Sequence, residues 1–158
     1  MTGFCYLALD FDGVLHPGNP IDASQRYSRM PLLAGWLRRW PQVMLVISSD
    51  WRERSTLEEL RSLFPADLGH RVLGTTPSLP AGPARREREI RSWLAGRGLE
   101  HANWAAIDDD ASAFTPDLSC LVLCETGADL TSQSLRAIEE RLHLRQPAAI
   151  AGRSEDPS

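Results

Sequence analysis

At 158 residues the chain has the length of one domain with a sizeable core, and 42% hydrophobic and 24% charged residues are ordinary for a globular protein. Its formal net charge of -4 gives no reason to expect a strong general affinity for nucleic acid or for membrane surfaces. No apolar run approaches transmembrane length, no secretory signal pattern opens the chain, and the three cysteines lack metal-ligand spacing, so we expect reduced thiols and a cytoplasmic location.

The first apolar run, residues 6–9, predicts a buried parallel strand that ends in two carboxylates, Asp10 and Asp12, and then Gly13. Side chains alternate along an extended chain, so both carboxylates are expected to point the same way, where their repulsion requires a cation or a shared proton. Gly13 permits a sharp turn that brings backbone N–H groups close to the same place. The stretch therefore indicates a Mg²⁺ and phosphate site, with a plain Asp-Gly turn as the alternative.

Residues 15–29 are rich in Pro, Gly, Ser and Asp and are expected to form a loop. His16 lies just past the aspartates; a catalytic role is one interpretation, but we expect a solvent-facing loop position. Apolar residues then recur at helical spacing and predict an amphipathic helix over residues 31–40. Trp36 and Trp40 are expected in its core-facing stripe.

A second buried strand is predicted over residues 43–47, and it ends in Ser48 and Ser49. Hydroxyls at the carboxyl end of a strand can hold a phosphate oxygen, although Ser and Asp are also preferred helix caps. We assign phosphate contact to Ser48 and capping to Ser49 or Asp50, and we keep Ser49, Gly13 and Arg52 as candidates for substrate binding. Capping-box spacing from residue 55 to residue 58 predicts the start of the next helix.

A short third strand is predicted over residues 71–75, a loop over 77–83 and a helix over 84–98. The first turns of this helix carry several arginines, which ordinarily form a solvated helix face. All 17 basic residues of the chain are arginines, so any fixed cation near a phosphate must be an arginine. One arginine near the helix start is therefore expected to reach back into the site.

A fourth strand over residues 104–107 closes in Asp108, Asp109 and Asp110. Three adjacent carboxylates repel one another without a cation, and Mg²⁺ prefers oxygen ligands; a polar turn is the alternative. A fifth strand is predicted over residues 120–124, and Thr131 is expected to cap a last helix. Residues 1–145 are interpreted as one domain and residues 146–158 as a loose polar tail.

Five short strands separated by helices predict an α/β fold in which a parallel sheet carries helices on both faces. Ligands bind such sheets at the carboxyl ends of the strands. Strands one, two and four each end there in polar residues. An ordinary turn could explain any one of these ends, but three such turns at the same edge are improbable.

The order of these motifs resembles the haloacid dehalogenase (HAD) superfamily: Asp-Phe-Asp-Gly-Val at 10–14, an apolar strand to Ser48, an arginine near a helix start, and a strand to Asp108-Asp109. Ser-Ser-Asp-Trp-Arg at 48–52, Arg86-x-x-Glu-Ile-x-x-Trp-Leu and Ile-Asp-Asp-Asp at 107–110 are similar to the small HAD domains of Swiss-army-knife RNA-repair proteins. The resemblance spans about residues 5–145. It implies a three-layer, Rossmann-like sheet of order 5-4-1-2-3, and the short segment after Val14 leaves no room for a sizeable cap domain.

The resemblance also implies roles for the catalytic residues. Asp10 would be the nucleophile and Asp12 the general acid and base. Ser48 would contact the phosphoryl group, and Arg86 would take the place usually held by a lysine. Arg85 is the fallback for that last role, because alignment within a charged helix can slip.

For the metal, the resemblance implies Mg²⁺ held by the side chain of Asp10, the main-chain oxygen of Asp12, and an acidic residue of the fourth strand. We expect Asp109 to be the direct ligand and Asp108 to act through water.

The function expected from these residues is Mg²⁺-dependent phosphomonoester hydrolysis through an aspartyl-phosphate. An open site would accept a phosphorylated small molecule or the accessible phosphorylated end of a macromolecule, and no membrane partner is expected. The alternatives are a nucleic-acid end-processing phosphatase, helped by a local patch of Arg85, Arg86, Arg88 and Arg91, and a catalytically silent, phosphate-responsive binding module.

Overall fold

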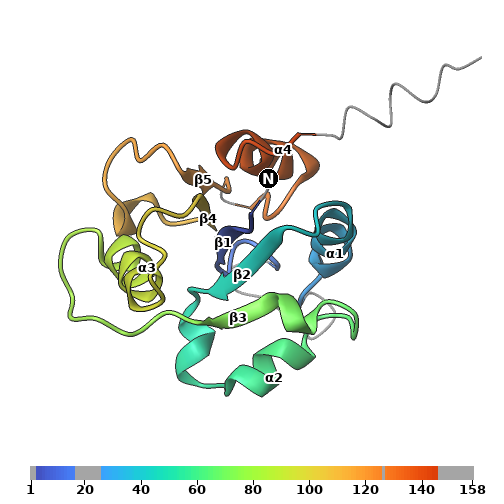
Figure 1. Cartoon of the computed structure of the whole chain (residues 1–158), viewed down its shortest axis with the longest axis horizontal. Coiled ribbons are helices and arrows are strands. Elements are labelled where there is room, and N and C mark those ends of the chain that lie inside the picture. Colours follow the sequence, from blue (N-terminus) through green and yellow to red (C-terminus); the bar gives the residue numbers. More distant parts are fainter. Residues whose placement is uncertain (1–2, 17–25, 126, 146–158) are drawn as a thin grey trace, which may run out of the picture.

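Five parallel strands form one sheet in the order β3-β2-β1-β4-β5, which confirms the predicted order (Figure 1). The computed structural model describes residues 3–16, 26–125 and 127–145, so the predicted tail and most of the loop after His16 lie outside the described residues. The strands are β1 (Cys5–Leu9), β2 (Val43–Ile47), β3 (Val72–Thr75), β4 (Trp104–Asp108) and β5 (Leu121–Leu123). They fall within one or two residues of the positions that the apolar runs predict.

Helices cover both faces of the sheet, as predicted (Figure 1). In the described part of the chain the α-helices are α1 (Met30–Arg39), α2 (Leu57–Ser62), α3 (Arg85–Gly96) and α4 (Ser132–Arg141). Short 3-10 helices, η2 (Asp50–Glu53), η3 (Gly69–Arg71) and η4 (Ala111–Ala113), lie in the connections. One core packs β1 and β2 against α1, α2 and α4, whereas α3 packs against the other face together with η4. No helix among the described residues is long and apolar enough to cross a membrane.

The face under α3 is lined by small side chains. Ala8, Val46 and Ala106 lie on the three central strands and contact Ile90 and Trp93 of α3 in one buried cluster. Alternation along each strand sends larger residues to the opposite face, where the other core lies. Small residues at the centre of the sheet let α3 approach closely, which brings the start of this helix to the strand ends.

Trp36 and Trp40 are buried, as predicted, and they also have a polar function. Both indole N–H groups donate to the same carboxylate oxygen of Glu139 in α4, at 2.9 and 3.1 Å. The helix caps are confirmed at Thr131 and corrected at α2, where the capping box begins at Thr56 rather than one residue earlier.

Arg71 is buried in η3, although the sequence predicts it as the first residue of the third strand. Its guanidinium donates to the main-chain oxygens of Leu37, Trp40 and Val43. These acceptors belong to the last turn of α1, the turn that follows it and the start of β2. One charged side chain therefore joins the end of α1 to the start of β2.

We expect Arg71→Ala to lower the free energy of unfolding by about 2–4 kcal/mol, because three buried carbonyl groups lose a charged donor. Urea denaturation followed by circular dichroism measures the change. Arg38→Ala is the matched control. Arg38 pairs with Asp67 at 2.9 Å, but both side chains are largely exposed, so the urea midpoint of this variant should stay close to that of the wild type. Equal losses in the two variants would contradict the assignment.

Candidate active site

The strand register brings three polar side chains into one row at the carboxyl edge of the sheet. Leu9 of β1 pairs with Ile47 of β2 on one side and with Ile107 of β4 on the other. The residues one position further along these strands are Asp10, Ser48 and Asp108. The prediction that the polar strand ends meet at one edge is therefore confirmed.

A carboxylate cluster forms at the centre of this edge. Asp10, Asp108 and Asp109 each offer an oxygen within 4.8 Å of the others. Asp10 and Asp108 are buried and Asp109 is exposed. Burial, followed by the nearby charge of Asp108, raises the pKa of Asp10 to about 8; burial also raises the pKa of Asp108 to about 6, although Arg86 opposes this shift.

Arg86 reaches into the cluster from the first turn of α3. One of its guanidinium nitrogens lies 3.2 Å from Asp10 Oδ1 and 3.5 Å from Asp108 Oδ2, and it also donates to the main-chain oxygen of Ser48. The other nitrogen lies 3.4 Å from Asp50. Arg85 instead pairs with Glu89 at 3.1 Å, so the geometry places Arg86 at the cluster.

The residues present fit a divalent cation. With all three carboxylates ionised, the single guanidinium of Arg86 leaves two negative charges uncompensated. Asp108 Oδ2 is buried and makes no hydrogen bond within the described part of the chain. Carboxylate oxygens grouped in this way are the ligands that Mg²⁺ prefers. Asp10, Asp108 and Asp109 are thus the side chains that could hold it, while the main-chain contribution of Asp12 stays a prediction.

Gly13 makes the predicted turn, but its role at the site differs from the predicted one of bringing a backbone N–H group to a phosphate. Its φ of +81° is left-handed, and a Cβ built on it would lie 2.1 Å from Asp109 Oδ2. Its N–H donates to the carbonyl of His16 at 2.8 Å, so this amide is not available to a phosphate. Gly13 therefore serves the site through the space that it leaves for Asp109.

Asp12 lies outside the carboxylate cluster. Because β1 ends at Leu9, alternation along an extended strand does not position Asp12, contrary to the sequence argument. Its Oδ1 lies 2.7 Å from His16 Nε2, and the indole N–H of Trp51 lies 3.1 and 3.2 Å from its two oxygens. The expectation of a solvent-facing His16 is wrong, because this side chain is 0% exposed. Sequence reasoning missed Trp51 too, since no local spacing relates it to Asp12.

The residues after β2 divide their roles. Ser48 is buried at the end of β2, and its main-chain oxygen accepts a hydrogen bond from Arg86. Ser49 accepts from the N–H of Trp51 at 3.2 Å and so caps η2, as predicted. Arg52 donates to Glu89 at 3.0 Å and to the carbonyls of Ser49 and Thr76. These partners occupy its buried guanidinium and give Arg52 a structural role, while its contact with a substrate stays a prediction.

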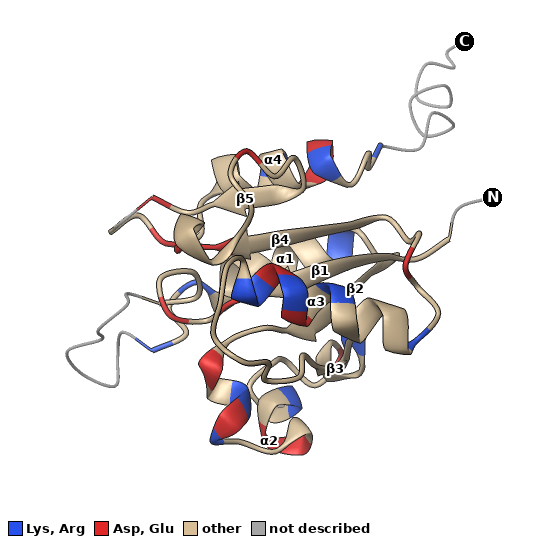
Figure 2. Cartoon of the chain, turned by 90° about the vertical axis from the view of Figure 1, so that its left-hand side faces the viewer, with Lys and Arg blue, Asp and Glu red and all other residues tan. Residues whose placement is uncertain are grey.

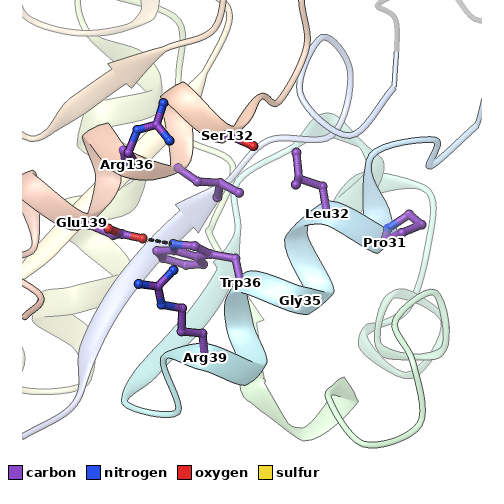
Figure 3. Close-up of a pocket in the computed structure, with 9 residues that line it drawn as sticks. Pro31, Leu32, Gly35, Trp36, Arg39, Ser132, Arg136 and Glu139 are labelled. Atoms are coloured by element: carbon purple, nitrogen blue, oxygen red, sulfur yellow. Dashed lines mark hydrogen bonds between the residues drawn. The ribbon is translucent and has the colours of Figure 1, made fainter. Parts of the chain in front are cut away.

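A polar cavity of about 290 Å³ adjoins Arg86 and is also lined by Asp50, Gly82, Arg85 and Ser112. It opens beside the carboxylate cluster and offers room for the organic part of a ligand. A second cavity, of about 350 Å³, lies between α1 and α4 against Leu32, Trp36 and Glu139 (Figure 3). None of the residues that line this second cavity belongs to the strand ends.

The sheet order and the acidic ends of β1 and β4 define a Rossmann-like α/β domain of HAD type. Residues 6–135 match the family described as the HAD domain in Swiss Army Knife RNA repair proteins, and the chain belongs to this family. No curated protein and no solved structure gives a significant match. Membership supports a HAD-type hydrolase in general.

We expect the metal-free protein to become less stable as pH rises between the ordinary pKa of Asp10, 3.8, and its value of about 8 in the folded chain. Across this window the folded state keeps protons that the unfolded state has released, so raising the pH favours unfolding. Urea denaturation in EDTA between about pH 5 and pH 8 measures the slope. Asp10→Asn should flatten it, and Mg²⁺ should raise the midpoint most at the alkaline end. A wild-type slope unchanged by Asp10→Asn would contradict the pKa assignment.

Gly13→Ala should abolish stabilisation by Mg²⁺, because the new methyl group would occupy the position of the Asp109 carboxylate. The midpoint of thermal unfolding, with and without the cation, is the measurement. Gly35→Ala is the control, since a Cβ at Gly35 meets nothing within 4 Å. A Gly13→Ala protein that keeps the full Mg²⁺ response would show that Asp109 is not a ligand.

Proposed function

We propose that this protein is a Mg²⁺-dependent phosphomonoester hydrolase that works through an aspartyl-phosphate on Asp10. The observation that carries the proposal is the cluster of Asp10, Asp108 and Asp109 in contact with Arg86. A buried carboxylate beside an excess of negative charge needs a divalent cation before it can meet a phosphate. Family membership supports the same chemistry.

In the first step an oxygen of Asp10 attacks phosphorus, and the bond from phosphorus to the leaving oxygen breaks. Asp12 gives its proton to that oxygen, so an alcohol departs. In the second step Asp12 takes a proton from water, the water oxygen attacks phosphorus, and inorganic phosphate leaves Asp10 free again. Asp12 thus loses one proton in the first step and regains one in the second.

Two further side chains are suited to hold the phosphoryl group. Arg86 lies 3.2 Å from the nucleophile Asp10. It can bind a non-bridging oxygen of the phosphoryl group while phosphorus forms its bond to Asp10. The hydroxyl of Ser48 is one strand away and can donate to a second non-bridging oxygen. When bound, Mg²⁺ supplies the positive charge that lets two anions approach. Because the pKa of Asp10 is raised, binding of the cation should release a proton.

A phosphorylated RNA end is the second candidate substrate, and its support is the description of the family. The arginine patch gives it little help. Arg85 pairs with Glu89, Arg91 pairs with Glu87, and Arg88 donates to main-chain oxygens, so the start of α3 presents mixed charge (Figure 2). Faster turnover of 3′- or 5′-phosphorylated oligonucleotides than of mononucleotides and sugar phosphates would favour this substrate.

Asp10→Asn should lower the rate of phosphate release from an aryl phosphate by at least about 10³-fold, because an amide cannot attack phosphorus. EDTA should abolish the wild-type activity and Mg²⁺ should restore it. Asp67→Asn is the control, since Asp67 pairs with Arg38 on the surface and should leave the rate unchanged. Activity that survives Asp10→Asn would rule out the nucleophile. A stable aspartyl-phosphate without phosphate release would favour the silent binding module instead.

A further inference from the structure

Two side chains from different segments hold the carboxyl group of Asp12. His16 Nε2 lies 2.7 Å from Oδ1, and the indole N–H of Trp51 lies 3.1 Å from Oδ1 and 3.2 Å from Oδ2. His16 follows four residues after Asp12, whereas Trp51 comes from η2, beyond the second strand. The Asp12 side chain is 41% exposed in spite of these contacts, so it stays accessible to a ligand.

The direction of the hydrogen bond from His16 is fixed by a second contact. The main-chain N–H of Tyr27 donates to His16 Nδ1 at 3.2 Å, so this nitrogen carries a lone pair and the proton lies on Nε2. The imidazole is therefore a donor to Asp12. Burial removes competing water from the ring, because the His16 side chain is fully enclosed.

An aromatic cluster of Phe11, His16, Tyr27 and Trp51 keeps both donors in place. The ring of His16 lies 5.3 Å from that of Tyr27 and 5.7 Å from that of Trp51, and Phe11 packs against both Tyr27 and Trp51. The main chain closes the same turn, since the carbonyl of His16 accepts from Gly13. Rings packed edge to face in this way have few alternative rotamers.

We propose that His16 and Trp51 are positioning residues for Asp12, which they orient as the general acid that protonates the leaving group. The proposal rests on the proposed function. The two donors take up Oδ1 and one side of Oδ2, so the remaining lone pair of Oδ2 is the position for the transferred proton. A carboxyl group held in one rotamer delivers that proton without first losing rotational freedom.

A purely structural role for the two residues predicts a different kinetic pattern. Loss of structure slows every substrate alike, whereas misplacement of a general acid matters most for leaving groups that are strong bases. The value of kcat/KM reports events up to transfer of the phosphoryl group to Asp10. Its dependence on the leaving group therefore separates the two roles.

The test uses Trp51→Phe, which keeps an aromatic ring but removes the N–H, and His16→Leu, which removes the donor. His16→Gln can still place an amide N–H near the position of Nε2 and is the rescue variant. Trp40→Phe is the matched control, because it removes an indole N–H that donates to Glu139 instead. The substrates are 2,4-dinitrophenyl, 4-nitrophenyl and phenyl phosphate, in order of rising leaving-group basicity.

With phenyl phosphate we expect Trp51→Phe and His16→Leu to lower kcat/KM at least about 10-fold, and His16→Gln to recover part of the loss. With 2,4-dinitrophenyl phosphate the loss should stay within about threefold, because this leaving group needs little protonation. Trp40→Phe should match the wild type across the series. Equal losses for all three esters, or no loss, would overturn the positioning role while leaving phosphatase activity intact.

A spectroscopic measurement tests the contacts without turnover. In ¹H–¹⁵N spectra His16 should show the tautomer protonated at Nε2, and the Trp51 indole signal, assigned by its absence in Trp51→Phe, should shift in Asp12→Ala. An Nδ1-protonated His16 or an unmoved Trp51 signal would overturn the proposal even in an active enzyme. An Asp10→Asn protein that still releases phosphate at the wild-type rate would instead contradict the proposed function, and the positioning role with it.

Discussion

The repulsion between carboxylates buried at the ends of β1 and β4 is the constraint on which the rest of this structure depends. Asp10 directly follows β1 and Asp108 is the last residue of β4. These strands are adjacent in the sheet, so the spacing of the strands sets the separation of the two residues. Burial of both groups is unfavourable, as their raised pKa values express. The fold tolerates them because Arg86 contacts both, and the three carboxylates at this edge could hold a cation.

The position of Arg86 depends in turn on how α3 begins. Glu89, buried one turn further along this helix, accepts hydrogen bonds from Arg52, from Arg85 and from the main chain of Leu79. These contacts tie the start of α3 to the segments that follow β2 and β3. Substitution at Glu89 would thus act on the site through the helix, without touching a ligand.

Much of the fold could be predicted from the sequence because buried parallel strands produce continuous apolar runs. Asp10, Ser48 and Asp108 could be placed at one edge for the same reason, since each directly follows such a run. The surroundings of Asp12 could not be predicted. The burial of His16 depends on contacts with Tyr27 and Trp51, which are distant in sequence, and residues 15–29 have the composition of an ordinary loop. The ion pair of Arg52 could not be predicted either, because a charged residue beside a phosphate site can equally neutralise a buried glutamate, here Glu89.

The central place of β1 in the sheet links formation of the candidate site to folding kinetics. Its neighbours β2 and β4 come from distant parts of the chain, so the pairs that flank Asp10 form only after two long loops have closed. The site needs residues from the ends of β1 and β4 and from the start of α3, which are far apart in the sequence. The site therefore forms when the sheet forms. Repulsion between the carboxylates of Asp10 and Asp108 opposes the pairing of β4 with β1. A cation bound there would offset this repulsion while the sheet forms as well as in the finished protein.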